Sequence, residues 1–163
     1  MYAAPTRRAP PEGGTSRNST RAGSGRNHIG SVQLMEHTSA SDIDWALAPA
    51  ENFTGTVRFG PLSDRSPEAL NALAVHFDPG ARTDWHTHPV GQVLYITNGA
   101  GLVQTDDGDT VEVAAGDVVY SPPGEVHWHG ARPNSPMTHL SLTTGGATEW
   151  LPRKVTDAEF GRR

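Results

Sequence analysis

The sequence predicts an all-β sandwich or barrel of antiparallel strands, and three observations support this. Short runs rich in Val, Thr, Tyr and Phe follow one another from Phe53 onward, at the lengths that strands favour. Turn-forming pairs such as Asn98-Gly99 and Asp107-Gly108 separate them and supply the positive φ angles of tight hairpins. Glycine (18) and proline (13) are plentiful, whereas long helical stretches with apolar periodicity are absent.

The expected strands occupy most of the chain between residues 53 and 143. They are residues 53–59, 72–77, 92–97, 101–105, 110–113, 117–121, 126–130 and 137–143. A short helix at roughly 156–160 is expected to follow them and to close one end of the barrel. Residues 35–163 are therefore interpreted as a single domain, with a barrel that spans about 53–145.

Residues 1–34 differ in composition from the rest of the chain. They are rich in Pro, Gly, Ser, Asn and Arg, and they hold few large apolar side chains. Such a segment buries too little apolar surface to offset the entropy lost on ordering, so we expect a disordered basic tail. We interpret Met35 as the natural start and residues 1–34 as an upstream translation artefact; the alternative is a functional basic arm.

Charge and residue types exclude several classes of function. The net charge is −5, and residues 1–34 carry five arginines and one glutamate, which leaves −9 for the rest. An acidic domain argues against nucleic-acid binding, which needs a clustered basic face. The chain has no cysteine, which removes disulfides, thiolate metal sites and cysteine nucleophiles. No apolar run is long enough to cross a membrane, and we expect a cytoplasmic protein.

Two segments carry residues with the chemistry and the spacing of metal ligands. His86 and His88 project to one face of an extended segment, because positions i and i+2 share a face. Gln92 has the same parity, and His127 lies on another expected strand after a Pro-Gly turn. Neutral imidazoles are common ligands of Zn, Mn, Fe, Co and Ni. The predicted ligands of one divalent metal ion inside the barrel are His86, His88, Gln92 and His127.

The same two segments resemble the two motifs of the cupin family. The first reads Gly80, five residues, His86-Thr87-His88, three residues, Gln92, six residues, Gly99. The second reads Gly116, five residues, Pro122-Pro123-Gly124, two residues, His127. The resemblance spans about residues 53–142, and it implies a jelly-roll barrel that holds the metal between the two motifs.

Two positions depart from the usual cupin pattern. Gln92 stands where cupins usually carry a glutamate ligand, and Ala131 stands where an asparagine is often found. The amide oxygen of Gln92 can bind a cation, but it brings no negative charge and cannot act as a base. The cation then keeps its full charge and is a stronger Lewis acid, and chemistry that needs a glutamate at this position is put in doubt.

Within the cupins, residues 53–160 are similar to the small bacterial manganese-dependent hydroxynitrile lyases. The similar segments are Phe53-Thr54-Gly55-Thr56-Val57-Arg58, Pro79-Gly80-Ala81-Arg82-Thr83, Trp85-His86-Thr87-His88-Pro89, Gly91-Gln92, His127-Trp128-His129-Gly130 and Met137-Thr138-His139-Leu140. These enzymes share the ligand set and cleave cyanohydrins to an aldehyde and hydrogen cyanide, or run the reverse addition with R selectivity. The resemblance implies manganese, with iron, nickel, cobalt or zinc as alternatives. It also implies a small-molecule substrate and a homo-dimer or homo-tetramer.

Cyanohydrin chemistry also needs a group that moves a proton. His139 lies on an expected strand with Ser141 and Thr143 on the same face, which we expect to point into the barrel. A histidine titrates near neutral pH and suits proton transfer, and the matching histidine of the lyases is thought to do this work. We therefore predict His139 as the catalytic residue; the alternative is a structural histidine hydrogen-bonded across strands.

The remaining side chains near the motifs carry weaker expectations. His129 either points inward with His127 or caps a strand end, and His76 either faces a pocket or has no specific role. Arg82 and Asp84 are expected to form a solvated pair. Core or interface packing, rather than substrate binding, is expected for Trp85, Trp128 and Trp150. The candidates for the pocket wall are Val75 and Tyr120.

Three functions compete at this point. The first is the lyase, the second is another metal-dependent cupin enzyme such as an iron dioxygenase or an isomerase, and the third is a binding protein for a small ligand. The two-histidine-one-carboxylate triad of many iron oxygenases is missing, although three-histidine iron sites exist. The chain also shows no DNA-binding helical segment of the kind that a regulator usually adds.

Overall fold

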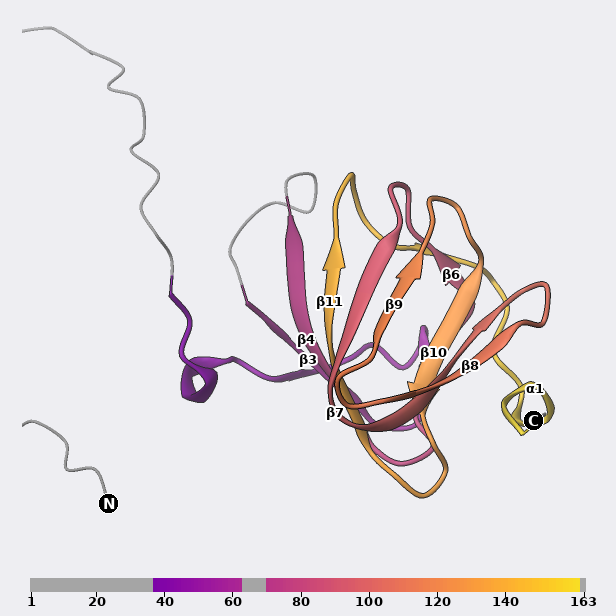
Figure 1. Cartoon of the computed structure of the whole chain (residues 1–163), viewed down its shortest axis with the longest axis horizontal. Coiled ribbons are helices and arrows are strands. Elements are labelled where there is room, and N and C mark those ends of the chain that lie inside the picture. Colours follow the sequence, from indigo (N-terminus) through magenta and orange to yellow (C-terminus); the bar gives the residue numbers. More distant parts are fainter. Residues whose placement is uncertain (1–36, 63–69, 162–163) are drawn as a thin grey trace, which may run out of the picture. The chain divides into compact units, whose positions relative to one another are not determined.

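The computed structural model describes residues 37–62 and 70–161, and these residues confirm the all-β prediction. They form a curled antiparallel sheet with a short 3-10 turn, η1 (Ala40–Asp42), before it and a short helix, α1 (Asp157–Phe160), after it (Figure 1). The tail predicted for residues 1–34 and the start predicted at Met35 lie outside the described residues. No helix within the described ranges is long and apolar enough to cross a membrane.

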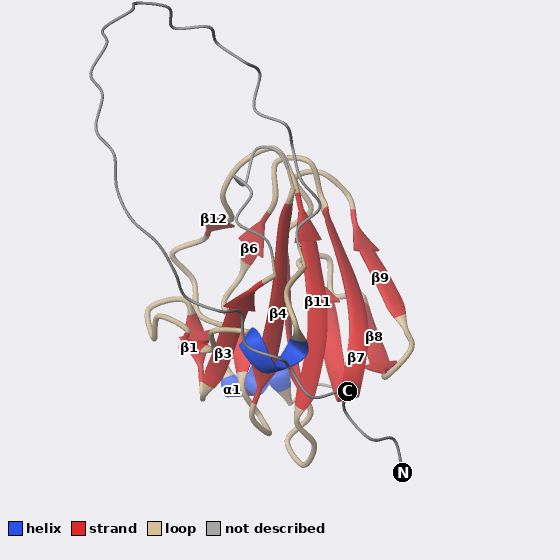
Figure 2. Cartoon of the chain, turned by 90° about the vertical axis from the view of Figure 1, so that its left-hand side faces the viewer, coloured by secondary structure: helices blue, strands red, loops and turns tan. Residues whose placement is uncertain are grey.

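Within the described ranges, twelve strands make up the sheet. They are β1 (Ala46–Leu47), β2 (Phe53–Thr54), β3 (Val57–Pro61), β4 (Asn71–Phe77), β5 (Arg82–Thr83), β6 (His86–Thr87), β7 (Gln92–Thr105), β8 (Thr110–Ala114), β9 (Val118–Ser121), β10 (His127–Ala131), β11 (Met137–Thr143) and β12 (Glu149–Trp150). The main path runs β1-β3-β4-β11-β7-β10-β5-β2, and β6, β8, β9 and β12 pair off it. Figure 2 shows β3, β4, β11 and β7 side by side as one broad face.

The long strand β7 corrects one prediction. Residues 92–97 and 101–105 were expected to be two strands joined by a hairpin at Asn98-Gly99, but they form one continuous strand. Its first half pairs with β11 and β9, and its second half pairs with β10 and β8. Gly99 has a positive φ of 74°, and a Cβ there would lie 1.9 Å from the carbonyl oxygen of Pro136. The Asn-Gly pair therefore accommodates a bend and a register shift against β11 instead of a turn.

Other boundaries also differ from the sequence-based prediction. The run 53–59 is broken into β2 and β3, the extended segment expected at His86 and His88 contains β6, and the short strands β1, β5 and β12 were not predicted. The predicted turn at Asp107-Gly108 is present, with the amide of Gly108 donating to the carbonyl of Thr105 at 3.0 Å. These short strands matter for the site, because β12 pairs β6 and β6 pairs β10.

Two clusters of apolar side chains lie on opposite sides of the sheet formed by β5, β7 and β10. The larger cluster fills part of the barrel interior and includes Phe77, Leu94, Ile96 and Met137. The smaller cluster contains Trp85 and Trp128, as their predicted packing role requires, together with Leu102 and Val155. The ring of Phe160 from α1 lies 5.8 Å from that of Trp128, so the helix packs on the outer side of β10. This differs from the expected closure of a barrel end.

Arg82 and Asp84 are not the solvated pair that the sequence suggested. They are 5% and 3% exposed, and each bonds to a different part of the C-terminal segment. Arg82 Nη2 lies 2.7 Å from Asp157 Oδ1, and Asp84 Oδ2 lies 2.8 Å from Lys154 Nζ. Residues two positions apart in an extended segment share a face, but this does not require them to pair with each other. Arg82 and Asp84 bond instead to Asp157 and Lys154.

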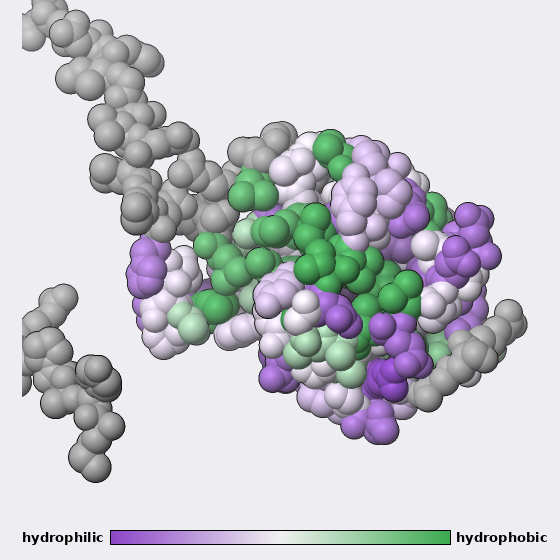
Figure 3. Space-filling view, viewed as in Figure 1, coloured by the Kyte–Doolittle hydropathy of each residue, from purple (hydrophilic) through white to green (hydrophobic). Residues whose placement is uncertain are grey.

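On the outer face of β4, β11, β7 and β9, two rows of side chains run across the strands and contain no charged residue. The rows are Ala72–Leu142–Val93–Tyr120 and Ala74–Leu140–Tyr95–Val118. Tyr95, Val118 and Tyr120 are 43%, 64% and 62% exposed, so Tyr120 lies on this surface and not in the pocket wall where it was predicted. Figure 3 shows hydrophobic residues gathered over these strands.

Candidate metal centre

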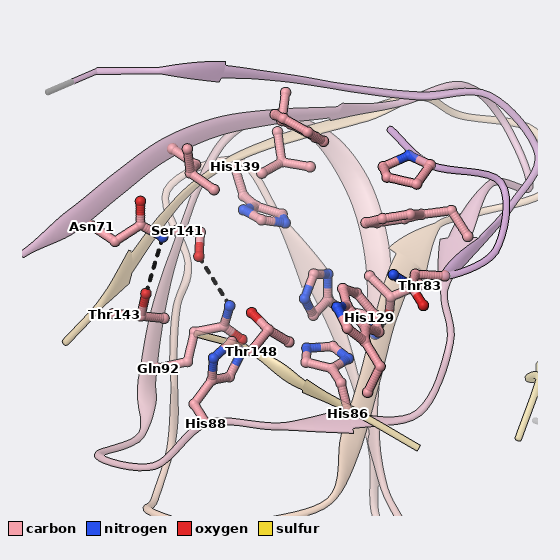
Figure 4. Close-up of a pocket in the computed structure, with 17 residues that line it drawn as sticks. Asn71, Thr83, His86, His88, Gln92, His129, His139, Ser141, Thr143 and Thr148 are labelled. Atoms are coloured by element: carbon pink, nitrogen blue, oxygen red, sulfur yellow. Dashed lines mark hydrogen bonds between the residues drawn. The ribbon is translucent and has the colours of Figure 1, made fainter. Parts of the chain in front are cut away.

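A cavity of about 230 Å³ opens into the barrel beside the larger apolar cluster. One part of its wall is polar and includes His86, His88, Gln92, His129 and His139 (Figure 4). Another part is apolar, and its side chains are Phe53, Phe59, Leu73, Val75 and Trp150. A polar end and an apolar wall in one concave space are the usual features of a small-molecule site.

Strand pairing brings the histidines together. His127 of β10 lies directly opposite His86 of β6, and their ring centroids are 4.4 Å apart. The ring of His88 lies 5.1 Å from that of His86, and the ring of His129 lies 5.2 Å from it. His139 follows at 4.9 Å from His129. All five rings are buried, with at most 4% of any of these residues exposed.

The tautomers of His86 and His127 follow from their backbone contacts. Nδ1 of His86 lies 2.9 Å from the carbonyl oxygen of Asp84, and Nδ1 of His127 lies 3.0 Å from that of Glu125. A carbonyl oxygen only accepts, so each Nδ1 carries the hydrogen and each Nε2 keeps a lone pair. Metal-binding histidines are held in the same way, through a hydrogen bond from the other ring nitrogen.

The amide oxygen of Gln92 places a further lone pair close to that of His127 Nε2. Its Nε2 donates to Ser141 Oγ at 2.9 Å, which turns its Oε1 toward Nε2 of His127, 3.0 Å away. With Nδ1 as the protonated nitrogen of His127, both of these facing atoms are acceptors, and they repel each other unless a positive charge lies near both. Two ligands that bind one octahedral ion at about 2.1 Å and at right angles lie about 3.0 Å apart. The donors present therefore fit a divalent cation.

Burial holds all five rings in the neutral state. Desolvation lowers the pKa of His88 to about 4 and that of His139 to about 3. Desolvation, with the charge of neighbouring histidines added, also lowers the pKa of His86 and His129 well below the usual value. The pKa of His127 is lowered by burial as well. Each neutral imidazole keeps a lone pair that can bind a cation or take up a proton transiently during a reaction.

His139 has no side-chain partner of its own in the part of the chain that the structure describes. Neither of its ring nitrogens has a side-chain hydrogen-bond partner there, and Nδ1 of His129 also lacks one. Leaving a buried polar atom unpaired costs about 1–3 kcal/mol, so such atoms are typical of places where a ligand binds. Because Ser141 and Thr143 line the cavity with His139, the predicted polar face of β11 does point inward.

The structure brings His86 and His127 together with a further histidine and leaves His88 outside that group. The ligand atoms that lie within 4.8 Å of one another belong to His86, His127 and His129, so His129 points inward. His76 lies elsewhere, with Nδ1 2.8 Å from Thr138 Oγ1 and Nε2 3.4 Å from Asp78 Oδ1. The choice among the possible ligands remains a prediction.

Several cavity residues were missed by the sequence-based analysis. Asn71 and Leu73 share the parity of Val75 on β4, so extending the alternation by four residues would have found them. Trp150 was expected only to pack, and it lines the cavity because β12 pairs with β6 opposite His86. That pairing joins distant segments through two-residue strands, for which the sequence carries no periodic signal.

Comparisons with known proteins agree with this geometry. The cupin domain model matches residues 73–143. The chain is 50% identical over 118 residues to an (R)-mandelonitrile lyase from Granulicella tundricola, covering 70% of this chain and 89% of that protein. A solved cupin-like protein from Thermotoga maritima is 35% identical, with a TM-score of 0.66 over 78% of this chain and 94% of that one. A polyketide cyclase from Streptomyces resistomycificus has the same fold at 17% identity, with a TM-score of 0.63 over 78% and 91%. The chain belongs to the cupin family.

Proposed function

We propose that this protein is a metal-dependent lyase that cleaves cyanohydrins to an aldehyde and hydrogen cyanide and forms them in reverse. One observation carries the proposal: ligand atoms of His86 and His127 lie within 4.8 Å of each other, Gln92 Oε1 lies 3.0 Å from Nε2 of His127, and His139, a neutral imidazole without a side-chain hydrogen-bond partner in the described part of the chain, faces the cavity beside them. The 50% identity to an (R)-mandelonitrile lyase supports it.

The proposed ligands of the cation are His86, His88, Gln92 and His127, and the proposed metal is manganese. A divalent cation there would supply positive charge that stabilises the negative charge developing on the substrate oxygen. His129 competes with His88 for the role of third imidazole, because its ring nitrogen lies within the 4.8 Å group. Metal content after His88→Ala and after His129→Ala separates the two: the variant that loses manganese has lost a ligand.

The remaining steps fall to the chain's own residues. In the cleavage direction, His139 accepts the proton of the cyanohydrin hydroxyl, and the carbon–carbon bond to the nitrile breaks with its electron pair leaving on cyanide. The proton then passes from His139 to cyanide, which departs as hydrogen cyanide. Gln92 cannot take this role, because an amide is not a base. The apolar wall formed by Phe53, Phe59, Leu73, Val75 and Trp150 receives the substituent of the aldehyde.

A metal-replacement experiment tests the proposal. The purified protein is stripped of metal, reloaded separately with Mn²⁺ and with Fe²⁺, and assayed for benzaldehyde released from mandelonitrile. We expect release above background with Mn²⁺. No release with Mn²⁺, together with oxygen consumption by the Fe²⁺ form on an aromatic or diketone substrate, would establish a dioxygenase in its place.

We also propose that the protein forms a homo-oligomer through the outer face of β4, β11, β7 and β9. A second copy can cover the two uncharged rows without burying an unpaired charge, which favours self-association over a charged partner. Tyr120→Lys would place a charge in that interface. We expect light scattering to show a dimer or tetramer for the natural chain and a smaller species for the variant; a natural chain that is monomeric would rule this out.

A further inference from the structure

One lysine outside the metal centre joins three segments of the chain that build the cavity wall. Nζ of Lys154 donates to Asp84 Oδ2 at 2.8 Å, to the carbonyl of Glu51 at 2.6 Å and to the carbonyl of Ala50 at 3.1 Å. An ammonium group has three hydrogens, so these bonds use all of its donors. We call this arrangement of Lys154, Asp84 and the two carbonyls the lysine clasp.

The first arm of the clasp leads to the turn before β2. Ala50 and Glu51 belong to a turn in which the amide of Asn52 donates to the carbonyl of Pro49 at 3.1 Å. Pro49 and Asn52 line the cavity, and Phe53 follows them in its apolar wall. Holding the two carbonyls of this turn therefore fixes one side of the cavity.

The second arm leads to a predicted metal ligand. The amide of Asp84 donates to the carbonyl of Asn52 at 2.8 Å, and its own carbonyl accepts from Nδ1 of His86 at 2.9 Å. The carboxyl side chain of Asp84 is 4% exposed, and its Oδ1 has no hydrogen-bond partner among the described residues. Lys154 therefore supplies the counter-charge of a carboxylate that sits two residues before His86.

The third arm is the C-terminal segment itself. Trp150, four residues before Lys154, pairs with His86 across β12 and β6. Its ring lies 4.9 Å from that of His86 and 5.3 Å from that of Phe53. The side chain of Lys154 is 54% exposed, so it is not part of the buried core.

We propose that Lys154 is a positioning residue, which fastens the turn 49–52 and the segment that carries Trp150 to Asp84 and so sets the shape of the cavity beside His86. Its effect on catalysis rests on the proposed function, but its effect on the structure does not. Groups that hydrogen-bond directly to a metal-binding histidine typically change metal affinity by about 10–100-fold when removed. Lys154 acts one step further out, through Asp84, so we expect the low end of that range.

Lys154→Met tests the clasp, because it keeps most of the side chain and removes the charge and the donors. The matched control is Arg153→Met: Arg153 pairs with Asp106 and lies over the ring of Trp85, 4.2 Å from its centroid, away from the cavity. Hydrogen exchange is measured at the amides of Asp84 and Asn52, binding of Mn²⁺ alone by titration, and KM and kcat with mandelonitrile.

In Lys154→Met we expect exchange at both amides to be at least about tenfold faster, Mn²⁺ binding to weaken by about tenfold, and KM to rise more than kcat falls. Arg153→Met should leave all of these unchanged. Exchange rates equal to those of the control would overturn the proposal, and so would faster exchange with unchanged Mn²⁺ affinity, since the clasp would then act on stability alone. If Lys154→Met does not fold, it is replaced in the same comparison by the double variant Asp84→Asn/Lys154→Met, which lacks both charges. Exchange and Mn²⁺ binding decide the matter even if the natural protein proves unable to cleave mandelonitrile.

Discussion

The barrel interior has a filled end and a hollow end, and the same strands build both. At the filled end, inward-facing side chains pack into the larger apolar cluster; they include Phe77 of β4, Ile96 of β7 and Met137 of β11. Further along the same strands, inward positions line the cavity and are largely polar: Asn71 of β4, Gln92 of β7 and His139, Ser141 and Thr143 of β11. Val75 belongs to both sets and marks the boundary.

This difference shows that facing inward does not by itself decide what a residue does. At the filled end, Phe77, Ile96 and Met137 are 0% exposed and their burial stabilises the fold. At the hollow end, buried ring nitrogens of His129 and His139 lack side-chain partners within the described residues, and this costs stability unless a ligand binds. Strand alternation therefore predicts the face, while the position along the strand separates packing from chemistry.

His139→Gln should give the largest effect at the hollow end. Glutamine keeps a polar side chain of similar size but cannot move a proton, and general acid–base catalysis typically contributes about 10²–10⁴-fold. We expect kcat for mandelonitrile to fall within that range while the manganese content stays that of the natural protein. Steady-state kinetics with metal analysis of the same sample makes the measurement. Turnover that survives with the metal in place would remove His139 from catalysis.

Ile96→Ala applies the matching test to the filled end. Ile96 is 0% exposed, and its truncation leaves a cavity in the larger cluster. We expect the free energy of unfolding to fall by about 2–5 kcal/mol, with KM for mandelonitrile little changed in the folded enzyme. Urea denaturation measures the first quantity and kinetics the second. A large rise in KM together with a small loss of stability would mean that the two ends are not separate in role.

Much of the barrel could be predicted because its long strands carry a clear alternation. Residues 137–143 were predicted to be a strand and form β11 with those bounds, with His139, Ser141 and Thr143 on the inward face. The closeness of His86 and His127 was expected because both segments resemble known motifs, and the inward position of His86 and His88 because residues two positions apart on a strand share a face. The resemblance contributed more than the periodicity, since spacing alone could not place His127 opposite His86.

The misses have a common physical cause, which is that distant pairing decides the conformation of short segments. Asn98-Gly99 has the composition of a hairpin turn, but partners on both sides of β7 keep the strand continuous through it. Trp150 reaches the cavity wall through β12, a strand of two residues. The burial of Asp84 depends on Lys154, seventy residues away, and no local pattern around Asp84 indicates that partner.

The pH dependence of the free energy of unfolding, measured on the metal-free protein, shows how much stability is lost by keeping the histidines of the hollow end buried and neutral. Burial lowers the pKa of His88 to about 4 and of His139 to about 3, below the ordinary value of 6.5. Below pH 6.5 the unfolded chain therefore binds protons that the folded chain does not, so stability falls on acidification until each folded pKa is reached. We expect a loss of about 1.4 kcal/mol per pH unit for each such histidine. Urea denaturation between pH 7 and about 4.5 measures the slope, which His139→Gln should reduce by one histidine; identical slopes would mean that His139 is not held neutral by burial.

Ser141→Ala makes the smallest change, one oxygen atom behind a predicted ligand. Ser141 Oγ accepts from Nε2 of Gln92 and thereby turns the amide oxygen toward His127. Without it the amide loses the bond that orients it, and we expect Mn²⁺ affinity to fall by about 10–100-fold in a direct titration. Ser121→Ala is the control, because Ser121 is buried on β9 opposite Gln92 in the same sheet. Equal affinities for the two variants would show that Gln92 needs no support from β11, and the polar row of that strand would then serve the substrate and not the metal.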